Sequence, residues 1–198
     1  MTLFGQTTSW LEVVAFISGF ASVWLTMRAH VANWPTGLVS VACFIFLFID
    51  AKLYADAALQ IAFIVLGIYG WWKWSLKQSQ TNDHLRIART TWQEALVLLL
   101  LCIGATAAIA AWLASRSDSP LPIADSSILV FSLAATWWQA RSRIESWFVW
   151  IGVDILSIPI YWSRDLKLTA VLYAIFLLVC FGGWYQWRKK LSLQAIAV

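Results

Sequence analysis

The sequence predicts an all-α integral membrane protein with seven transmembrane helices arranged as three, one and three. Two observations carry this prediction. The first is composition: of 198 residues, 61% are hydrophobic and 12% are charged, which is more apolar surface than one soluble core can bury. The second is an internal repeat that relates the first three apolar segments to the last three. We expect a single membrane domain over residues 1–198.

Seven apolar segments approach the length of a membrane-spanning helix. A hydrocarbon core about 30 Å thick needs roughly 20 helical residues, with about 17 to 25 tolerated. We expect the helices at about 10–28, 34–50, 55–74, 93–114, 126–140, 146–162 and 168–187. The second, fifth and sixth are short, as segments that line a cavity can be. The polar run from Lys77 to Arg89 is expected to be a solvated loop.

The distribution of positive charges predicts an orientation, because loops rich in Lys and Arg tend to remain cytoplasmic. With seven spans, one side collects ten of the 14 Lys and Arg residues, and the other collects Lys52, Arg116, Arg164 and Lys167. The N-terminus is therefore expected outside and the C-terminus in the cytoplasm. The excess of positive charge fits anionic lipid headgroups and does not point to nucleic acid. The opening stretch MTLFGQTTSW lacks Lys and Arg, so the first helix is expected to be retained.

A shift of 113 positions aligns the first three segments with the last three. Tryptophan pairs alone are expected by chance, but this offset also pairs other residue types: Trp24 with Trp137, Arg28 with Arg141, Trp34 with Trp147, Phe63 with Phe176, Gly70 with Gly183, and Trp74 with Trp187. Three spans per repeat and one linking helix give both repeats the same orientation. We expect parallel repeats over about 10–74 and 126–187, a linker helix at about 93–114, and a substrate site near the midplane between them.

One acid, Asp154, lies in the middle of an apolar segment. A carboxylate that faces lipid costs roughly 2.5 to 3.5 kcal/mol on insertion scales, so Asp154 is expected to face protein or water. At helical spacing, its face also carries Trp147, Trp150 and Tyr161. An aromatic face with one anion suits a flat organic cation. The alternative is a structural acid, paired with an arginine at a helix end or with backbone groups.

Four sequence elements occur together: the NWPTG start, the LYAD turn and its following Gln60, the closing GWWKW, and the WxxWxxxD element at Trp147, Trp150 and Asp154. In this combination they resemble the PnuC family of bacterial vitamin transporters. The resemblance implies a SWEET-like fold in the bacterial inner membrane. It also implies uptake of nicotinamide riboside for NAD biosynthesis by facilitated diffusion, with a cytoplasmic vitamin kinase that traps the arriving substrate. In the nicotinamide riboside carriers of the family, the WxxWxxx element typically ends in Asn. Asp154 at this position therefore leaves thiamine, the substrate of a close subgroup, as an alternative.

The remaining candidates extend the expected substrate path. Trp147, near a helix end, fits an interfacial aromatic belt equally well, whereas Trp150 lies deeper and is favoured for stacking on a cationic ring. Gln60 and Tyr173 hold equivalent positions in the two repeats, and a polar group at membrane depth needs a partner. We therefore expect them to contact a carboxamide or a ribose. The other candidates are aromatic: Trp34, Phe63, Tyr161 and Phe176.

Other residues have simpler interpretations. Gly70 and Gly183 are expected to allow close helix packing. Pro159, inside its segment, is a better candidate for a hinge than Pro35, which lies near a helix start. The three cysteines, Cys43, Cys102 and Cys180, are expected to be small buried hydrophobes.

An enzyme is disfavoured, because Ser157 near Asp154 lacks an intramembrane histidine as activating base. An ion channel would show carbonyl-lined loops or rings of charge, and neither is visible. No metal or cofactor is expected. The sequence leaves the oligomeric state open, a homo-oligomer included.

Overall fold

The computed structural model describes residues 2–3, 6–7, 10–50, 54–80, 85–116, 120–163 and 167–196. Within these ranges the seven predicted helices are present, as α1 (Trp10–Met27), α2 (Asn33–Asp50), α3 (Tyr54–Gln80), α4 (Trp92–Arg116), α5 (Pro122–Ala140), α6 (Ser146–Ser163) and α7 (Lys167–Ile196). Before α1, two short strands that the all-α prediction did not include, β1 (Thr2–Leu3) and β2 (Gln6–Thr7), pair antiparallel. Lys52 and Arg164, which entered the predicted orientation, lie outside the described residues.

Two helices are longer than their apolar segments. α3 continues to Gln80, into the predicted solvated loop, and α7 continues past Trp187 to Ile196. The added residues are mostly Lys, Leu, Gln and Ser, which do not break a helix. The apolar run predicts which part of each helix lies in the membrane, and the helix propensity of the following residues extends the helix beyond it.

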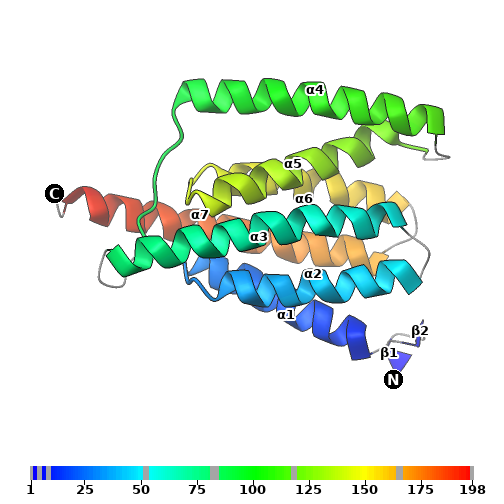
Figure 1. Ribbon diagram of the computed structural model, residues 1–198, viewed down its shortest axis with the longest axis horizontal. Helices are drawn as coiled ribbons and strands as arrows, with labels where there is room; N and C mark the ends of the chain where they lie inside the picture. Colours follow the sequence, from blue (N-terminus) through cyan, green and yellow to red (C-terminus); the bar gives the residue numbers. More distant parts are fainter. Residues whose placement is uncertain are drawn as a thin grey trace. The chain divides into compact units, whose positions relative to one another are not determined.

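The chain divides into two compact units, residues 1–85 and 86–198. In the first unit, α2 packs against both α1 and α3; in the second, α5 packs against α4 and α6, and α6 packs against α7 (Figure 1). Four described segments are long and apolar enough to cross a membrane: Trp10–Met27, Asn33–Asp50, Trp92–Arg116 and Ala170–Ala195. α6 is also 18 residues long and carries Asp154 and Pro159 within its apolar run. The helix continues through Pro159.

The turns that follow α1 and α5 contain the same backbone hydrogen bonds at the 113-residue offset. After α1, Ala29 is left-handed at φ 56°; its N–H donates to the Thr26 carbonyl at 2.8 Å, and the His30 N–H donates to the Leu25 carbonyl at 3.0 Å. This is a Schellman motif, which satisfies carbonyls at a helix end. A non-glycine residue in this conformation costs roughly 1 to 3 kcal/mol, so the surrounding contacts must hold it there.

The turn after α5 repeats the motif. Ser142 is left-handed at φ 60°; its N–H donates to the Gln139 carbonyl at 2.9 Å, and the Arg143 N–H donates to the Trp138 carbonyl at 2.9 Å. One residue before each left-handed position, an arginine lies over a tryptophan of its own helix: Arg28 over Trp24 at 5.0 Å and Arg141 over Trp137 at 5.7 Å. These correspondences support the predicted internal repeat.

Packing within the first unit depends on a close contact between α2 and α3. The ring of Trp34 lies edge-on to Trp74, with ring centroids 5.4 Å apart and planes at 89°. A Cβ atom on Gly70 would overlap the Trp34 ring. Glycine is therefore required at this position to let the two helices approach, as expected for Gly70.

An extended segment before α4 is bound to the turn between α5 and α6. The Ala88 N–H donates to the Ser142 carbonyl and the Ile144 N–H donates to the Ala88 carbonyl, both at 3.0 Å, as in a short parallel bridge. The Thr90 N–H donates to Glu145 Oε2 at 2.9 Å. The predicted solvated loop is therefore wrong for this part, because the turn supplies partners for its backbone.

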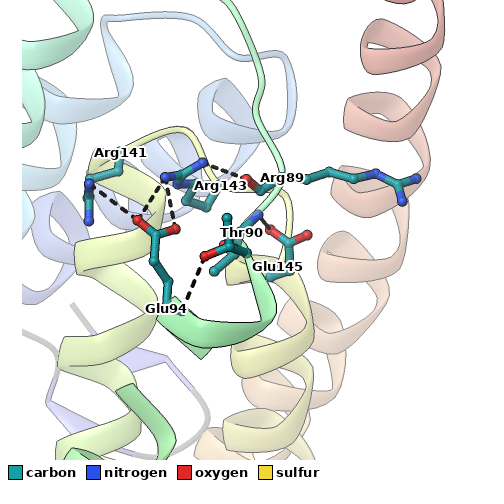
Figure 2. A network of polar contacts seen from close by, with 7 residues as sticks. Arg89, Thr90, Glu94, Arg141, Arg143 and Glu145 are labelled. Carbon is teal, nitrogen blue, oxygen red and sulfur yellow. Dashed lines mark hydrogen bonds and ion pairs between the residues drawn. The ribbon is translucent and has the colours of Figure 1, made fainter. Parts of the chain in front are cut away.

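Charged side chains complete this attachment, as Figure 2 shows. Arg143 donates to the two carboxylate oxygens of Glu94 at 2.9 and 3.1 Å, and to the Arg89 carbonyl at 2.5 Å. Arg141 lies 3.7 Å from the same carboxylate. Glu94 is in the first turn of α4, and its N–H donates to the Thr91 hydroxyl at 3.2 Å, an N-cap interaction. We call the side chains of Glu94, Arg141, Arg143 and Glu145 the α4 clamp.

Candidate functional site

Three of the residues predicted to share a face of α6 are directed at α7. Trp147 lies edge-on to Trp187, with ring centroids 5.4 Å apart and planes at 87°. A Cβ atom on Gly183 would overlap the Trp147 ring, as at the equivalent contact in the first unit. Trp147 is 2% exposed, and its Nε1 donor has no hydrogen-bond partner among the described residues. It is part of the helix packing and also carries an unused buried donor.

Two turns further along α6, Asp154 meets Cys180 of α7. The Cys180 thiol donates to Asp154 Oδ2 at 3.4 Å, and the two residues are 4% and 2% exposed, respectively. The sequence offered two structural partners for this acid, an arginine and backbone groups, and the partner that the structure shows is a neutral thiol. The expectation that Cys180 is a small buried hydrophobe is therefore incomplete.

Another two turns along α6, Tyr161 meets Tyr173 of α7. Their ring centroids are 5.0 Å apart, and Phe176 lies edge-on to Tyr173 at 6.1 Å. The predicted residues Tyr161, Tyr173 and Phe176 thus form one aromatic cluster at the α6–α7 contact. All three are half-buried.

Trp150 departs from the shared face. Its Nε1 donates to Gln139 Oε1 of α5 at 2.9 Å, so the side chain is directed at α5 rather than α7. A buried indole N–H usually finds an acceptor, and Gln139 supplies one near the end of α5. Helical spacing placed Trp150 near the Asp154 face, but this hydrogen bond was not visible from α6 alone.

The predicted residues of the first unit lie on α2 and α3. Trp34 is buried against α3, and its Nε1, like that of Trp147, has no partner among the described residues. Gln60 and Phe63 are half-buried on α3.

Sequence reasoning missed Cys180 and Gln139 as partners of site residues. The spacing along α7 could have indicated Cys180. Tyr173, Cys180 and Trp187 are seven residues apart, as are their partners on α6. Ser157 is also fully buried, and its hydroxyl has no partner among the described residues. Among all the residues that the structure describes, no three His, Cys, Asp or Glu side chains come together as a metal site requires.

A groove of about 380 Å³ lies between α5 and α6. It is mostly apolar, and its lining residues are Ser127, Phe131, Phe148, Val149, Gly152, Val153 and Leu156. None of the predicted site residues belongs to this lining. The polar groups of α6 are therefore not in this groove.

Large apolar side chains remain exposed along the spans, among them Ile17, Leu101 and Leu178, as lipid-facing positions require. The interior of the second unit holds a buried acid and unpartnered polar atoms instead. This combination defines a multi-pass membrane protein with a polar site inside its helices, the class to which membrane transporters belong.

Comparison with known proteins gives the family. Residues 9–189 match the family described as nicotinamide mononucleotide transporter, and the chain belongs to this family. It is therefore a membrane transporter and not an enzyme, which confirms the resemblance to PnuC proteins. The chain is 24% identical to the nicotinamide riboside transporter PnuC of Escherichia coli, over 92% of this chain and 87% of the relative.

Two further comparisons agree. The chain is 26% identical to the riboflavin/roseoflavin transporter RibM of Streptomyces davaonensis, over 93% of this chain and 87% of that protein. The crystal structure of the vitamin B3 transporter PnuC has the same fold, with a TM-score of 0.75 at 23% identity, covering 93% of this chain and 83% of that one. The predicted fold class is confirmed as helical and PnuC-like.

Proposed function

We propose that this protein carries nicotinamide riboside across the bacterial inner membrane by facilitated diffusion. Similarity to relatives with that name supports the proposal. Similarity to a riboflavin transporter is of the same order, so sequence identity does not choose the substrate. The choice therefore rests on the chemistry of the site.

The observation that carries the choice is Asp154. Its carboxylate is 2% exposed inside a helix bundle, and the partner it has in the structure is an uncharged thiol. A buried charge is stable when an opposite charge compensates it. Nicotinamide riboside carries a positively charged pyridinium ring and thiamine a thiazolium ring, whereas the ring system of riboflavin is neutral. Asp154 thus favours a cationic vitamin, and thiamine remains the alternative substrate.

The predicted path residues have matching chemistry. Trp147 and Trp34 each contribute a buried indole N–H without a partner among the described residues, and such donors are rare unless a ligand or water uses them. Tyr161, Tyr173 and Phe176 provide aromatic faces and two hydroxyls. We include Trp150, Gln60 and Phe63 in the proposed path on their sequence positions.

Transport is proposed to need no coupling ion. Among the described residues of the spans, Asp154 is the acid that combines a mid-helix position with full burial, so a relay of several acids is not evident. Accumulation then depends on a cytoplasmic kinase that phosphorylates the vitamin and traps it. Liposomes that enclose a nicotinamide riboside kinase and ATP should accumulate labelled product. Empty liposomes should stop at equal inside and outside concentrations. Uptake above that level, driven by an imposed proton or sodium gradient, would contradict this mechanism.

Substrate choice is tested with the purified protein in liposomes. Uptake of nicotinamide riboside, thiamine and riboflavin is compared for the parent, Asp154→Asn and Asp154→Leu. Charge compensation predicts that Asp154→Asn weakens binding of a cationic vitamin by about 1 to 3 kcal/mol, roughly 5- to 150-fold. If the carboxylate instead accepts hydrogen bonds from ribose, Asn is tolerated and Leu is damaging. A folded Asp154→Leu protein that transports at the parental rate would remove Asp154 from the site.

We also propose an external N-terminus, a cytoplasmic C-terminus and parallel repeats. The distribution of Lys and Arg supports the orientation, and the two matching Schellman turns support the repeats. Single cysteines near each terminus, labelled with an impermeant maleimide in intact spheroplasts, test the orientation. Labelling of the C-terminal cysteine without lysis would contradict it.

A further inference from the structure

The contact between α6 and α7 is a ladder of three side-chain pairs in one register. Trp147 pairs with Trp187, Asp154 with Cys180, and Tyr161 with Tyr173. Each step is seven residues on both helices, which is two helical turns. The two aromatic pairs therefore fix the distance and register at which the middle pair meets.

The first unit has the same ladder position without the polar pair. Trp34 and Trp74 reproduce the tryptophan pair, with the same centroid distance of 5.4 Å. The residues equivalent to Asp154 and Cys180 are Val41 and Gly67. Because α2 and α3 pack against each other with Val41 and Gly67 at these positions, packing alone does not require an acid and a thiol. A buried acid is costly in a membrane, so its presence in one repeat indicates a function there.

We propose that Cys180 is a positioning residue that orients the carboxylate of Asp154 toward the transported vitamin. The proposal rests on the proposed role of Asp154 in binding. The terminal torsion of an aspartate side chain is broad, so a carboxylate without a fixed partner samples many orientations. The thiol engages Oδ2 and leaves the other oxygen and the remaining lone pairs for a ligand.

The choice of a thiol has a chemical consequence. A thiol is a weak, uncharged donor, so it restricts the carboxylate without cancelling its negative charge. An arginine at this position would fix the group more strongly and would neutralise it, which removes the attraction for a cationic ring. Cysteine at position 180 therefore combines a fixed orientation with a retained charge.

The test is the affinity of the purified protein for nicotinamide riboside. Cys180→Ala removes the donor and is expected to weaken binding by about 2- to 12-fold, the range for one hydrogen bond. Cys180→Ser keeps a donor and is expected to bind within about 3-fold of the parent. Cys102→Ala is the matched control: this buried cysteine of α4 packs among apolar residues, with Val130 and Ala134, and its replacement should leave affinity unchanged.

A role through Asp154 predicts non-additivity, which a general packing role does not. In the Asp154→Asn background, where the acceptor is uncharged, Cys180→Ala should weaken binding by only about 1.4- to 3.5-fold, the square root of the loss in the parent, since neutral hydrogen bonds are roughly half as strong. An equal loss in both backgrounds would overturn the proposal, as would parental affinity in Cys180→Ala.

A measurement without ligand separates this proposal from the proposed function. The S–H stretching band of Cys180, identified as the infrared band missing from Cys180→Ala, should move to higher frequency in Asp154→Asn. An unmoved band would overturn the proposal even if transport is as expected. A parent protein that binds none of the three vitamins would instead overturn the proposed function, while the band shift would still decide whether the pair exists.

Discussion

The α4 clamp gives a quantitative prediction about how α4 is held. Arg143 makes two charge-assisted hydrogen bonds to Glu94, with side-chain exposures of 19% and 34%. Hydrogen bonds to charged groups contribute about 1.5 to 3 kcal/mol when buried, and exposed ion pairs about 0 to 1 kcal/mol. For this partly exposed, two-pronged pair we expect a coupling free energy of about 1 to 2 kcal/mol.

A double-mutant cycle isolates this value. Glu94 also lies in the first turn of α4, where a negative charge is favourable by itself, so Glu94→Gln alone overstates the pair. The cycle therefore uses Glu94→Gln, Arg143→Gln and the double variant, with melting temperatures compared at one scan rate in detergent. For a chain of this size, about 1 kcal/mol corresponds to a shift of roughly 2 to 4 °C. Arg116→Gln, exposed at the other end of α4, is the control.

The salt dependence of the cycle is a second check. Because the pair is partly exposed, its coupling should fall when the salt concentration is raised from about 0.1 to 1 M, as the screening length shortens from about 10 to 3 Å. Single variants whose shifts add up to that of the double variant at low salt would refute the argument. The Arg143–Glu94 contact in Figure 2 would then be present in the structure without stabilising the fold.

Two further predictions concern single contacts. Gly70→Ala and Gly183→Ala should each lower the stability of the folded protein by about 1 to 3 kcal/mol in melting experiments, because the new methyl group overlaps a tryptophan ring. Gly104→Ala, where a Cβ atom would meet nothing within 4 Å, should leave the melting temperature unchanged or raise it. Gln139→Leu removes the acceptor of Trp150 and should raise the KM for uptake, whereas Gln139→Glu keeps an acceptor and should not; equal KM values would count against the contact.

The helices could be predicted because their signal is local. Apolar runs at or near membrane length located all seven helices, and helical spacing placed Asp154 on a face that meets α7. The partner of that acid could not be predicted, because pairing depends on the register between two helices. The aromatic pairs set that register, and it emerges only when α6 and α7 are packed together.

The segment before α4 shows the other limit. Arg143 was counted only as a positive charge in the orientation argument, and Glu145 was not singled out; a charge count says nothing about the partners of either side chain. In the structure they bind Glu94 and the Thr90 N–H, residues about 50 positions away in the sequence. Contacts between distant segments leave no periodic pattern in either one.

The unit that repeats in the sequence differs from the unit that packs. The offset relates three helices to three helices, but the second packing unit begins at Arg86 and contains four, because the clamp binds α4 to the turn after α5. The equivalent turn of the first repeat keeps Arg28 in place of Arg141, but it has His30 and Ala32 where the clamp has Arg143 and Glu145, so it lacks these two charged side chains. A chain cut between Gln80 and Arg86 would leave every clamp residue on the second fragment. If the two fragments, of three and four helices, were co-expressed, α4 would therefore fold with the second fragment. The linker helix is a structural part of the second unit and is more than a connection between the two units.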